Sequence, residues 1–217
     1  SMSGLIYKSM PRFVRSKYVI PPELFEVEDY EIKYYLITAF ALAEKNITLM
    51  GTANPSTILK IANVLEYQSA SLIRDIRRGS FENLKTLSDD VRQCINHTFT
   101  KNASRAIELE QILYEKKRLG LSDIWPNLRA VSTWTGGSCA VLISSLKTQL
   151  PKTTRIVELG YLSTEFRGNI TIDILNNKAI PTLDTNFFEF VEKEDWESEK
   201  PDFLTLEQIE IGKQYFV

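Results

Sequence analysis

The sequence has few of the residues from which many catalytic and metal sites are built. Among its 217 residues there are one histidine, His97, and two cysteines, Cys94 and Cys139. Zinc sites, disulfide frameworks and Cys–His nucleophilic pairs need more of these side chains than this sequence supplies. We therefore interpret His97 as a surface or helix-end residue and both cysteines as reduced members of the core.

Long apolar runs and an excess of one charge are also lacking. No run approaches the ~18 apolar residues that a membrane-spanning helix needs, and no signal-peptide pattern is present. The net charge of −2 gives no drive toward nucleic acid. We therefore expect a cytoplasmic protein with no membrane or nucleic-acid partner. The acidic segment 184–210 predicts a solvated loop and edge, with a docking surface as the alternative.

What remains is the composition of an ordinary globular protein, with 43% hydrophobic and 25% charged residues. The length suits a single domain of above-average size, 1–217, or a core domain with an appended piece. Residues 1–26 predict an extended, loop-rich segment, residues 27–120 a mainly helical half and residues 121–217 a strand-rich half. The closing "IGKQYFV" stops within a strand pattern, so we expect the chain to be a fragment of a larger protein.

Apolar residues at helical spacing predict helices in the first half of the chain, at about 28–44, 55–78, 88–97 and 103–118. For the second of these, Asn54 can act as the cap, Pro55 fits the first helical position and Gly79 suits the end. Gly120 is expected to close the last one.

Short apolar or β-branched runs predict the strands. "NITLMG" reads as a short buried strand. "RAVSTW" reads as a strand and "RIVEL" as a buried strand, with "GSCAVLISSLKTQ" as a helix between them. The runs "ITIDIL", "FFEFVE" and "KQYFV" then follow without helices between them. Strand–helix–strand units that lead into an antiparallel run predict an α/β fold, with a mixed β-sheet flanked by helices.

Two glycine-containing loops follow neighbouring strands of this sheet. "WTGGSCAV" (Trp134–Val141) lets a ligand approach the backbone at a helix start, or it is a tight turn with Ser138 as the helix cap. "GYLSTEFRG" (Gly160–Gly168) adds a ring that can stack on a base, two hydroxyls for a phosphate and the Glu165 carboxylate for Mg²⁺. The alternative for Glu165 is a solvated carboxylate. Because ends of parallel strands lie side by side, we expect the two loops to meet.

These loops belong to a longer series of segments that resembles a known family. In sequence order the segments are "RDIRRGSF", "DIWPNLRAVSTWTGG", "YLSTEFRG", "FFEF" and "LEQIEIGKQYF". The series resembles the auxin-responsive promoter family of acyl acid amido synthetases, within the adenylate-forming superfamily. The resemblance covers most of the chain from about residue 20 onward. It implies the central part of the large N-terminal domain of an adenylate-forming enzyme.

The resemblance implies a two-step ligase that uses ATP and Mg²⁺. A small carboxylic acid is adenylated, and an amine such as an amino acid then displaces AMP. Gly136 and Gly137 would flank the adenine and Tyr161 would stack on it. The hydroxyls of Ser163 and Thr164 would contact the phosphates. Glu165 would hold Mg²⁺, which makes Thr164 and Glu165 the expected catalytic residues.

The resemblance also predicts which parts of the enzyme lie elsewhere. The phosphate loop is expected before Ser1, the ribose-binding aspartate after Val217, and the C-terminal domain beyond it. The chain alone is therefore expected to be inactive. The alternative hypothesis is a binding or interaction module that keeps the fold and has lost the chemistry.

Overall fold

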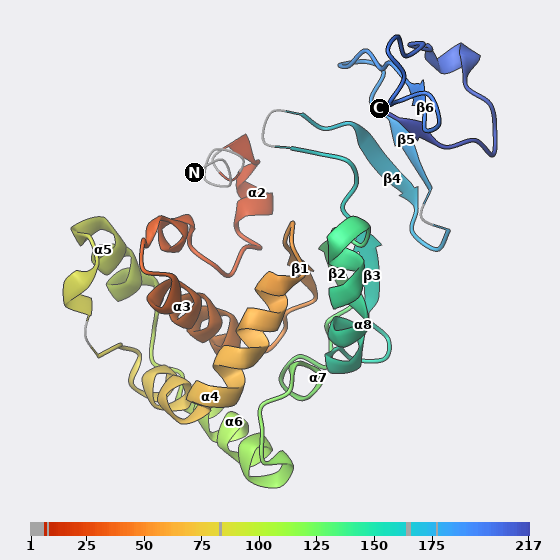
Figure 1. Ribbon diagram of the computed structural model, residues 1–217. Helices are drawn as coiled ribbons and strands as arrows, with labels where there is room; N and C mark the ends of the chain where they lie inside the picture. The colour runs from red at the N-terminus through yellow and green to blue at the C-terminus, as the bar shows by residue number, and fades with distance from the viewer. Residues whose placement is uncertain (1–6, 8, 83, 164–165, 177) are drawn as a thin grey trace. The chain divides into compact units, whose positions relative to one another are not determined.

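The structure is a computed structural model that describes residue 7 and residues 9–82, 84–163, 166–176 and 178–217 (Figure 1). The chain divides into two compact units, Ser1–Leu159 and Gly160–Val217. The first holds most of the helices and a parallel sheet, and the second is built from strands and turns.

Helices dominate the first unit. They are α2 (Arg12–Arg15), α3 (Tyr30–Ala43), α4 (Ser56–Arg78), α5 (Asp89–Thr98), α6 (Ala103–Lys116), α7 (Leu121–Ile124) and α8 (Ala140–Gln149), with 3₁₀ turns at Pro22–Glu26, Leu84–Thr86 and Gly137–Cys139. The helices expected at 28–44, 55–78, 88–97 and 103–118 are thus confirmed to within two residues at each end. No helix in the described part of the chain has the length and apolar character needed to cross a bilayer.

The ends of α4 and α6 can be compared with the cap and stop residues predicted from the sequence. Asn54 accepts a hydrogen bond from the backbone N–H of Ser56 at 2.9 Å, although Pro55, and not Asn54, occupies the cap position of α4. Gly79 ends α4 at φ 72°, the left-handed region that favours glycine. Lys117 at φ 60°, not Gly120, ends α6, and Gly120 instead precedes α7. A lysine can adopt this conformation at some cost, so glycine alone was an incomplete stop signal.

The N-terminal segment is less extended than its prolines suggested. Pro11 stands at the cap position of α2 with φ −55°, and Pro22 is the first residue of the Pro22–Glu26 turn. The ring of proline fixes φ near the helical value, and its missing N–H is not needed at a helix start. These prolines therefore begin short helices rather than maintain extended chain.

The sheet of the first unit has three parallel strands in the order β1 (Leu49–Gly51), β2 (Ala130–Thr133) and β3 (Arg155–Glu158). Only the middle strand alternates between buried and half-buried residues. The expectation of buried outer strands is wrong, because β1 and β3 form the two edges. Leu49 is 62% exposed, and β3 contains no buried residue.

The second unit contains two antiparallel pairs. β4 (Asn169–Asp173) pairs with β5 (Lys178–Pro181), and β6 (Val191–Glu192) pairs with β7 (Tyr215–Phe216). The α/β class is confirmed, and the described strands are divided among a parallel sheet and two separate antiparallel pairs. A parallel strand needs a long crossover, whereas an antiparallel neighbour needs only a turn. The residues described between β4 and β5 form a turn, and these two strands pair with each other.

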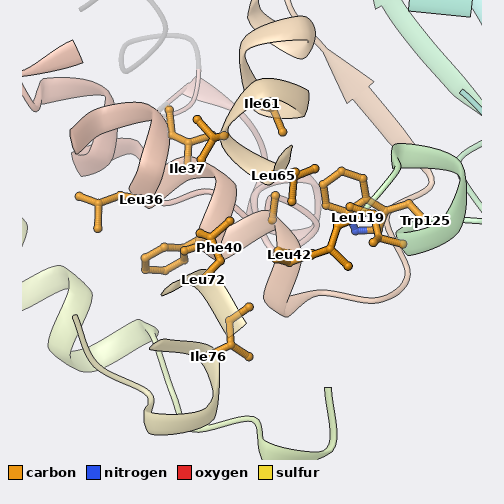
Figure 2. Close-up of a cluster of buried hydrophobic side chains, with 14 of the residues drawn as sticks. Leu36, Ile37, Phe40, Leu42, Ile61, Leu65, Leu72, Ile76, Leu119 and Trp125 are labelled. Atoms are coloured by element: carbon orange, nitrogen blue, oxygen red, sulfur yellow. The ribbon is translucent and has the colours of Figure 1, made fainter. Parts of the chain in front are cut away.

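The core of the first unit lies between α3 and α4 (Figure 2). It extends to buried residues of α6 and α7. The expected apolar stripe of α4 is buried there, at Ile58, Ile61, Leu65, Leu72, Ile73 and Ile76. Polar side chains connect the end of α3 to later elements, among them Trp125 and Arg105. Trp125 donates its Nε1–H to the carbonyl of Glu44 at 2.9 Å. Arg105 donates to the carbonyls of Leu42 and Ile124 at 3.0 and 2.9 Å.

A row of aromatic rings runs through the second unit, and Phe188 and Phe190 within it are buried. Centroids of neighbouring rings lie 5.4–6.4 Å apart along the series Tyr161, Phe166, Phe188, Phe190 and Tyr215. The acidic segment 184–210 contributes Phe188 and Phe190 to this row. Its carboxylate residues are exposed, apart from Glu192 and Asp195, which are half-buried. This exposure agrees with a solvated loop and edge.

Candidate functional site

Backbone hydrogen bonds connect the loops that follow β1 and β2 at the carboxyl edge of the parallel sheet. Thr52 donates its N–H to the carbonyl of Ser132 at 3.0 Å. Trp134 donates its N–H to the carbonyl of Ala53 at 3.0 Å, and the Thr133 hydroxyl donates to the same carbonyl at 3.1 Å. We call the segment Trp134–Val141 the glycine loop. Its start therefore has a fixed position relative to the loop that leads into α4.

A carboxylate from β3 holds the glycine loop from the other side. Thr133 and Glu158 are partners in the register of β2 and β3. Glu158 Oε2 accepts the backbone N–H of Thr135 at 2.8 Å and also the Thr135 hydroxyl. Glu158 was not among the site residues predicted from the sequence. The available signal was an acidic residue at the end of the otherwise apolar run "RIVEL".

The two glycines of this loop are exposed and have open space around them. A Cβ atom added to Gly136 or Gly137 would meet no atom within 4 Å. Gly137 has φ 55°, which disfavours other residues, whereas Gly136 has φ −94° and ψ 176°, which any residue can adopt. The fold itself therefore does not require glycine at position 136. Open space here is what a ligand that lies against the backbone would need.

Ser138 does not cap the following helix. It lies within the 3₁₀ turn Gly137–Cys139 and is exposed, and neither that turn nor α8 has a side-chain cap hydrogen bond. The tight-turn interpretation with Ser138 as the cap is therefore wrong. The left-handed Gly137 starts a turn that continues directly into α8, so the cap position shifts to Cys139.

The single histidine and the two cysteines of the sequence differ in their burial. Cys139 is buried and His97 is exposed in the last turn of α5, as expected. Cys94 is only half-buried, and its thiol donates to Glu23 Oε2 at 3.3 Å. Partial burial and this hydrogen bond raise the pKa of the Cys94 thiol. A protonated thiol is a poor nucleophile, so these observations give no support for Cys94 as a nucleophile.

In the second unit, the segment "GYLSTEFRG" folds back on itself. Gly168 donates its N–H to the carbonyl of Tyr161 at 2.7 Å, and Ser163 donates its N–H to the carbonyl of Phe166 at 2.8 Å. Thr164 and Glu165 come between Ser163 and Phe166 in the sequence and lie outside the described residues. Their predicted phosphate and Mg²⁺ roles therefore remain predictions.

Close contacts explain why glycine stands at both ends of this segment, at Gly160 and Gly168. A Cβ atom on Gly168 would lie 2.6 Å from both the Tyr161 and the Phe166 rings, so the rings pack directly on the Gly168 backbone. Gly160 has φ 98°, and a Cβ atom there would lie 2.5 Å from Asn169 Oδ1. The same oxygen accepts the backbone N–H of Tyr161 at 2.9 Å. Tyr161 is thereby positioned, yet it remains 54% exposed and available to stack on a base.

Replacing Gly168 with alanine should destabilise the second unit and displace the Tyr161 ring. Because the new methyl group would overlap two rings, we expect a loss of about 1–3 kcal/mol in the free energy of unfolding. Near-ultraviolet circular dichroism would report the tyrosine environment. Gly212→Ala is the matched control, since Gly212 has φ 95° and open space, and its cost comes from the backbone alone. An unchanged tyrosine signal in Gly168→Ala would contradict this packing.

The predicted site residues thus fall into three groups. Gly136 and Gly137 belong to the first unit, Tyr161 and Ser163 to the second, and Thr164 and Glu165 lie outside the described residues. Among the described residues, no group of three or more His, Cys, Asp or Glu side chains could hold a metal ion.

Comparison with solved structures supports the fold. A structure of the GH3.15 acyl acid amido synthetase matches with a TM-score of 0.76 at 20% identity, and the match covers 97% of this chain and 37% of that one. The AtGH3.15 acyl acid amido synthetase in complex with 2,4-DB matches with a TM-score of 0.69 at 20% identity, over 84% of this chain and 32% of that one. The chain therefore spans about a third of the length of these structures.

Comparison of the sequence with protein families gives the assignment. Among curated proteins, no relative matches the chain. The GH3 family N-terminal domain, however, matches residues 1–155, which is most of the sequence. This match confirms the resemblance drawn from the sequence segments. The chain belongs to the GH3 family.

Proposed function

We propose that this chain is part of the large domain of an ATP-dependent acyl acid amido synthetase. In the proposed reaction, a carboxylate attacks the α-phosphorus of ATP to form an acyl-adenylate and release pyrophosphate. An amine such as an amino acid then attacks the acyl carbon, releases AMP and gives up a proton. Membership of the GH3 family supports the proposal, as does the structural match to acyl acid amido synthetases.

The observation that carries the proposal is the open glycine loop at the carboxyl edge of the parallel sheet. Ligands of open α/β sheets bind at this edge. The loop is held from β1 by backbone hydrogen bonds and from β3 by Glu158, while the space over Gly136 and Gly137 is free. A planar base can lie against such a backbone. We therefore assign the adenine of ATP to this loop.

The segment "GYLSTEFRG" supplies groups for the rest of the nucleotide. The exposed Tyr161 ring offers a face for the base, and the hydroxyls of Ser163 and Thr164 are donors that suit phosphate oxygens. Glu165 carries the oxygen ligand that Mg²⁺ prefers. When bound beside the phosphates, Mg²⁺ would neutralise charge that develops as pyrophosphate leaves.

The acid substrate is proposed to be a small organic carboxylic acid. One matched structure holds the acyl acid 2,4-DB, which makes this compound a reasonable first candidate. ATP–pyrophosphate exchange with a panel of such acids tests the function in the complete protein that contains this chain. We expect acid-dependent exchange in the complete protein and none with residues 1–217 alone. A folded complete protein that shows no exchange with any acid would favour a non-catalytic binding module.

Replacing Gly136 with alanine should weaken ATP binding without weakening the fold. Alanine adopts the conformation of Gly136 and meets no protein atom, so the free energy of unfolding should change by less than ~0.5 kcal/mol. A methyl group between the loop and the base should raise the KM for ATP at least tenfold. Ser144→Ala, on the exposed side of α8, is the control and should leave KM unchanged. An unaltered KM in Gly136→Ala would remove the adenine from this loop.

A further inference from the structure

Glu158 stands where the hydrogen-bond ladder between β2 and β3 ends. The backbone bonds of two parallel strands alternate along the ladder, and at the carboxyl end of this one the N–H of Leu159 donates to the carbonyl of Thr133 at 3.1 Å. If the ladder continued in the same register, the N–H of Thr135 would donate to the carbonyl of Leu159. It donates instead to Glu158 Oε2 at 2.8 Å. The side chain of Glu158 therefore takes the place of the next backbone acceptor.

The same carboxylate also holds the side chain of Thr135. The Thr135 hydroxyl donates to Glu158 Oε2, so one carboxylate oxygen accepts both the N–H and the O–H of this residue. Hydrogen bonds to an ionised acceptor are stronger than those between neutral groups. Both residues are half-buried, which limits the competition of water for these bonds. A single side chain of β3 therefore fixes the backbone and the side chain of Thr135 together.

The two residues directly before the glycine pair are held from opposite sides of β2. Trp134 donates its N–H to the carbonyl of Ala53 in the loop after β1, whereas Thr135 donates its N–H to Glu158 on β3. The first of these bonds joins two backbone groups, so substitutions of side chains do not remove it. The second depends on the identity of one side chain. Of these two bonds, only the one to Glu158 can therefore be tested by changing a single residue.

The glycine pair that follows Thr135 needs such an anchor if a ligand is to bind there. Gly136 and Gly137 are exposed, and a Cβ atom added to either would meet no atom within 4 Å. Two adjacent glycines give a backbone more conformational freedom than other residues do. A ligand that binds such a backbone has to order it, and this ordering lowers the affinity. An anchor at Thr135 restricts the loop before the ligand arrives and so reduces that loss.

We propose that Glu158 is a positioning residue of the nucleotide site, which acts through Thr135 to hold the backbone of Gly136 and Gly137 where the base lies against it. This role rests on the proposed function, which assigns the adenine of ATP to the glycine loop. Loss of a residue that only positions the base should weaken ATP binding and leave the rate at saturating ATP nearly unchanged. A role in folding alone would instead lower the amount of folded protein and leave the KM of the folded fraction unchanged.

The test compares three variants of the complete protein by calorimetric titration with ATP and by ATP–pyrophosphate exchange. Glu158→Ala removes the acceptor, so the Kd and the KM for ATP should rise about tenfold while kcat stays within about twofold. Glu158→Gln keeps a carbonyl oxygen that can accept both bonds from Thr135, so both constants should stay within about threefold of the parent values. Arg155→Ala is the matched control, because Arg155 is exposed at the start of the same strand, and it should change neither constant.

Two further measurements test whether Glu158 acts through Thr135. Thr135→Val removes the hydroxyl and keeps the N–H, so it should raise the KM for ATP less than Glu158→Ala does. Added to Glu158→Ala, it should have no further effect, because its partner is already gone. In residues 1–217, amide hydrogen exchange of Thr135 should become at least about tenfold faster in Glu158→Ala and stay unchanged in Arg155→Ala.

The outcomes separate this role from the proposed function. A complete protein that binds ATP but shows no exchange with any acid would contradict the proposed reaction, and the Kd values would still test Glu158. A complete protein that binds no ATP would overturn both. If the parent protein binds ATP and Glu158→Ala binds it equally tightly, or if amide exchange of Thr135 is unaltered, the role of Glu158 alone is wrong.

Discussion

Replacement of Glu165 by alanine is expected to lower ATP–pyrophosphate exchange at least a hundredfold in the complete protein. The expectation rests on the place of this carboxylate in "YLSTEFRG", beside two hydroxyls and after the exposed Tyr161 ring. Loss of a Mg²⁺ ligand removes charge stabilisation at the phosphates, and a hundredfold in rate corresponds to about 2.7 kcal/mol. Exchange measured over a range of Mg²⁺ concentrations should also show a weakened dependence on the metal.

A matched variant separates the metal role from a general loss of negative charge. Glu189 lies in the same unit and its side chain is exposed, so Glu189→Ala should leave exchange unchanged. The free energy of unfolding of both variants is expected to stay within ~0.5 kcal/mol of that of the parent protein. If Glu165→Ala exchanges at the parent rate, Glu165 is a solvated carboxylate and the proposed metal site is wrong.

Local signals in the sequence were enough to locate the helices and the glycine loops. The stripe on α4 repeats at helical spacing, and Asn54 and Gly79 mark its two ends through backbone chemistry that acts within a few residues. The same kind of signal located Gly136 and Gly137 between a strand and a helix. Features that depend on neighbours in sequence can be predicted from sequence alone.

Features that depend on distant neighbours could not be predicted in this way. β1 was expected to be buried from its apolar residues, but burial depends on what covers a strand, and β1 is an edge of the sheet. Glu158 acquires its role only because the register of β2 and β3 places it beside Thr135. Asp75 and Tyr35 meet across 40 residues of chain. No spacing rule connects such pairs.

Replacement of Arg105 by methionine is expected to destabilise the first unit by about 3 kcal/mol. Arg105 is 4% exposed, and its guanidinium donates to the carbonyls of Leu42 and Ile124, both in buried residues. Methionine fills similar space but leaves two buried carbonyls without donors. For a chain of this length the melting temperature should fall by roughly 6–12 °C. The carbonyls belong to α3 and α7, the helices that precede β1 and β2, so this clamp sets where both strands begin.

Two further variants and a pH series test whether the clamp acts through these carbonyls. Arg105→Lys should recover only part of the loss, because an ammonium lacks the planar fork that reaches both oxygens. Glu108→Gln should lower the free energy of unfolding by less than ~1 kcal/mol, since the carboxylate is 34% exposed.

The pH series rests on the pKa of Glu108. Although partial burial opposes ionisation, hydrogen bonds from Lys45 and Arg105 lower this pKa. The stability that ionised Glu108 adds to the fold is therefore present above the pKa that Glu108 has in the unfolded chain, and it is lost as the pH falls through the lowered pKa of the folded state. Arg105→Met should reduce this loss of stability in acid. A melting temperature of Arg105→Met equal to that of the parent would show that apolar packing alone holds the ends of α3 and α7.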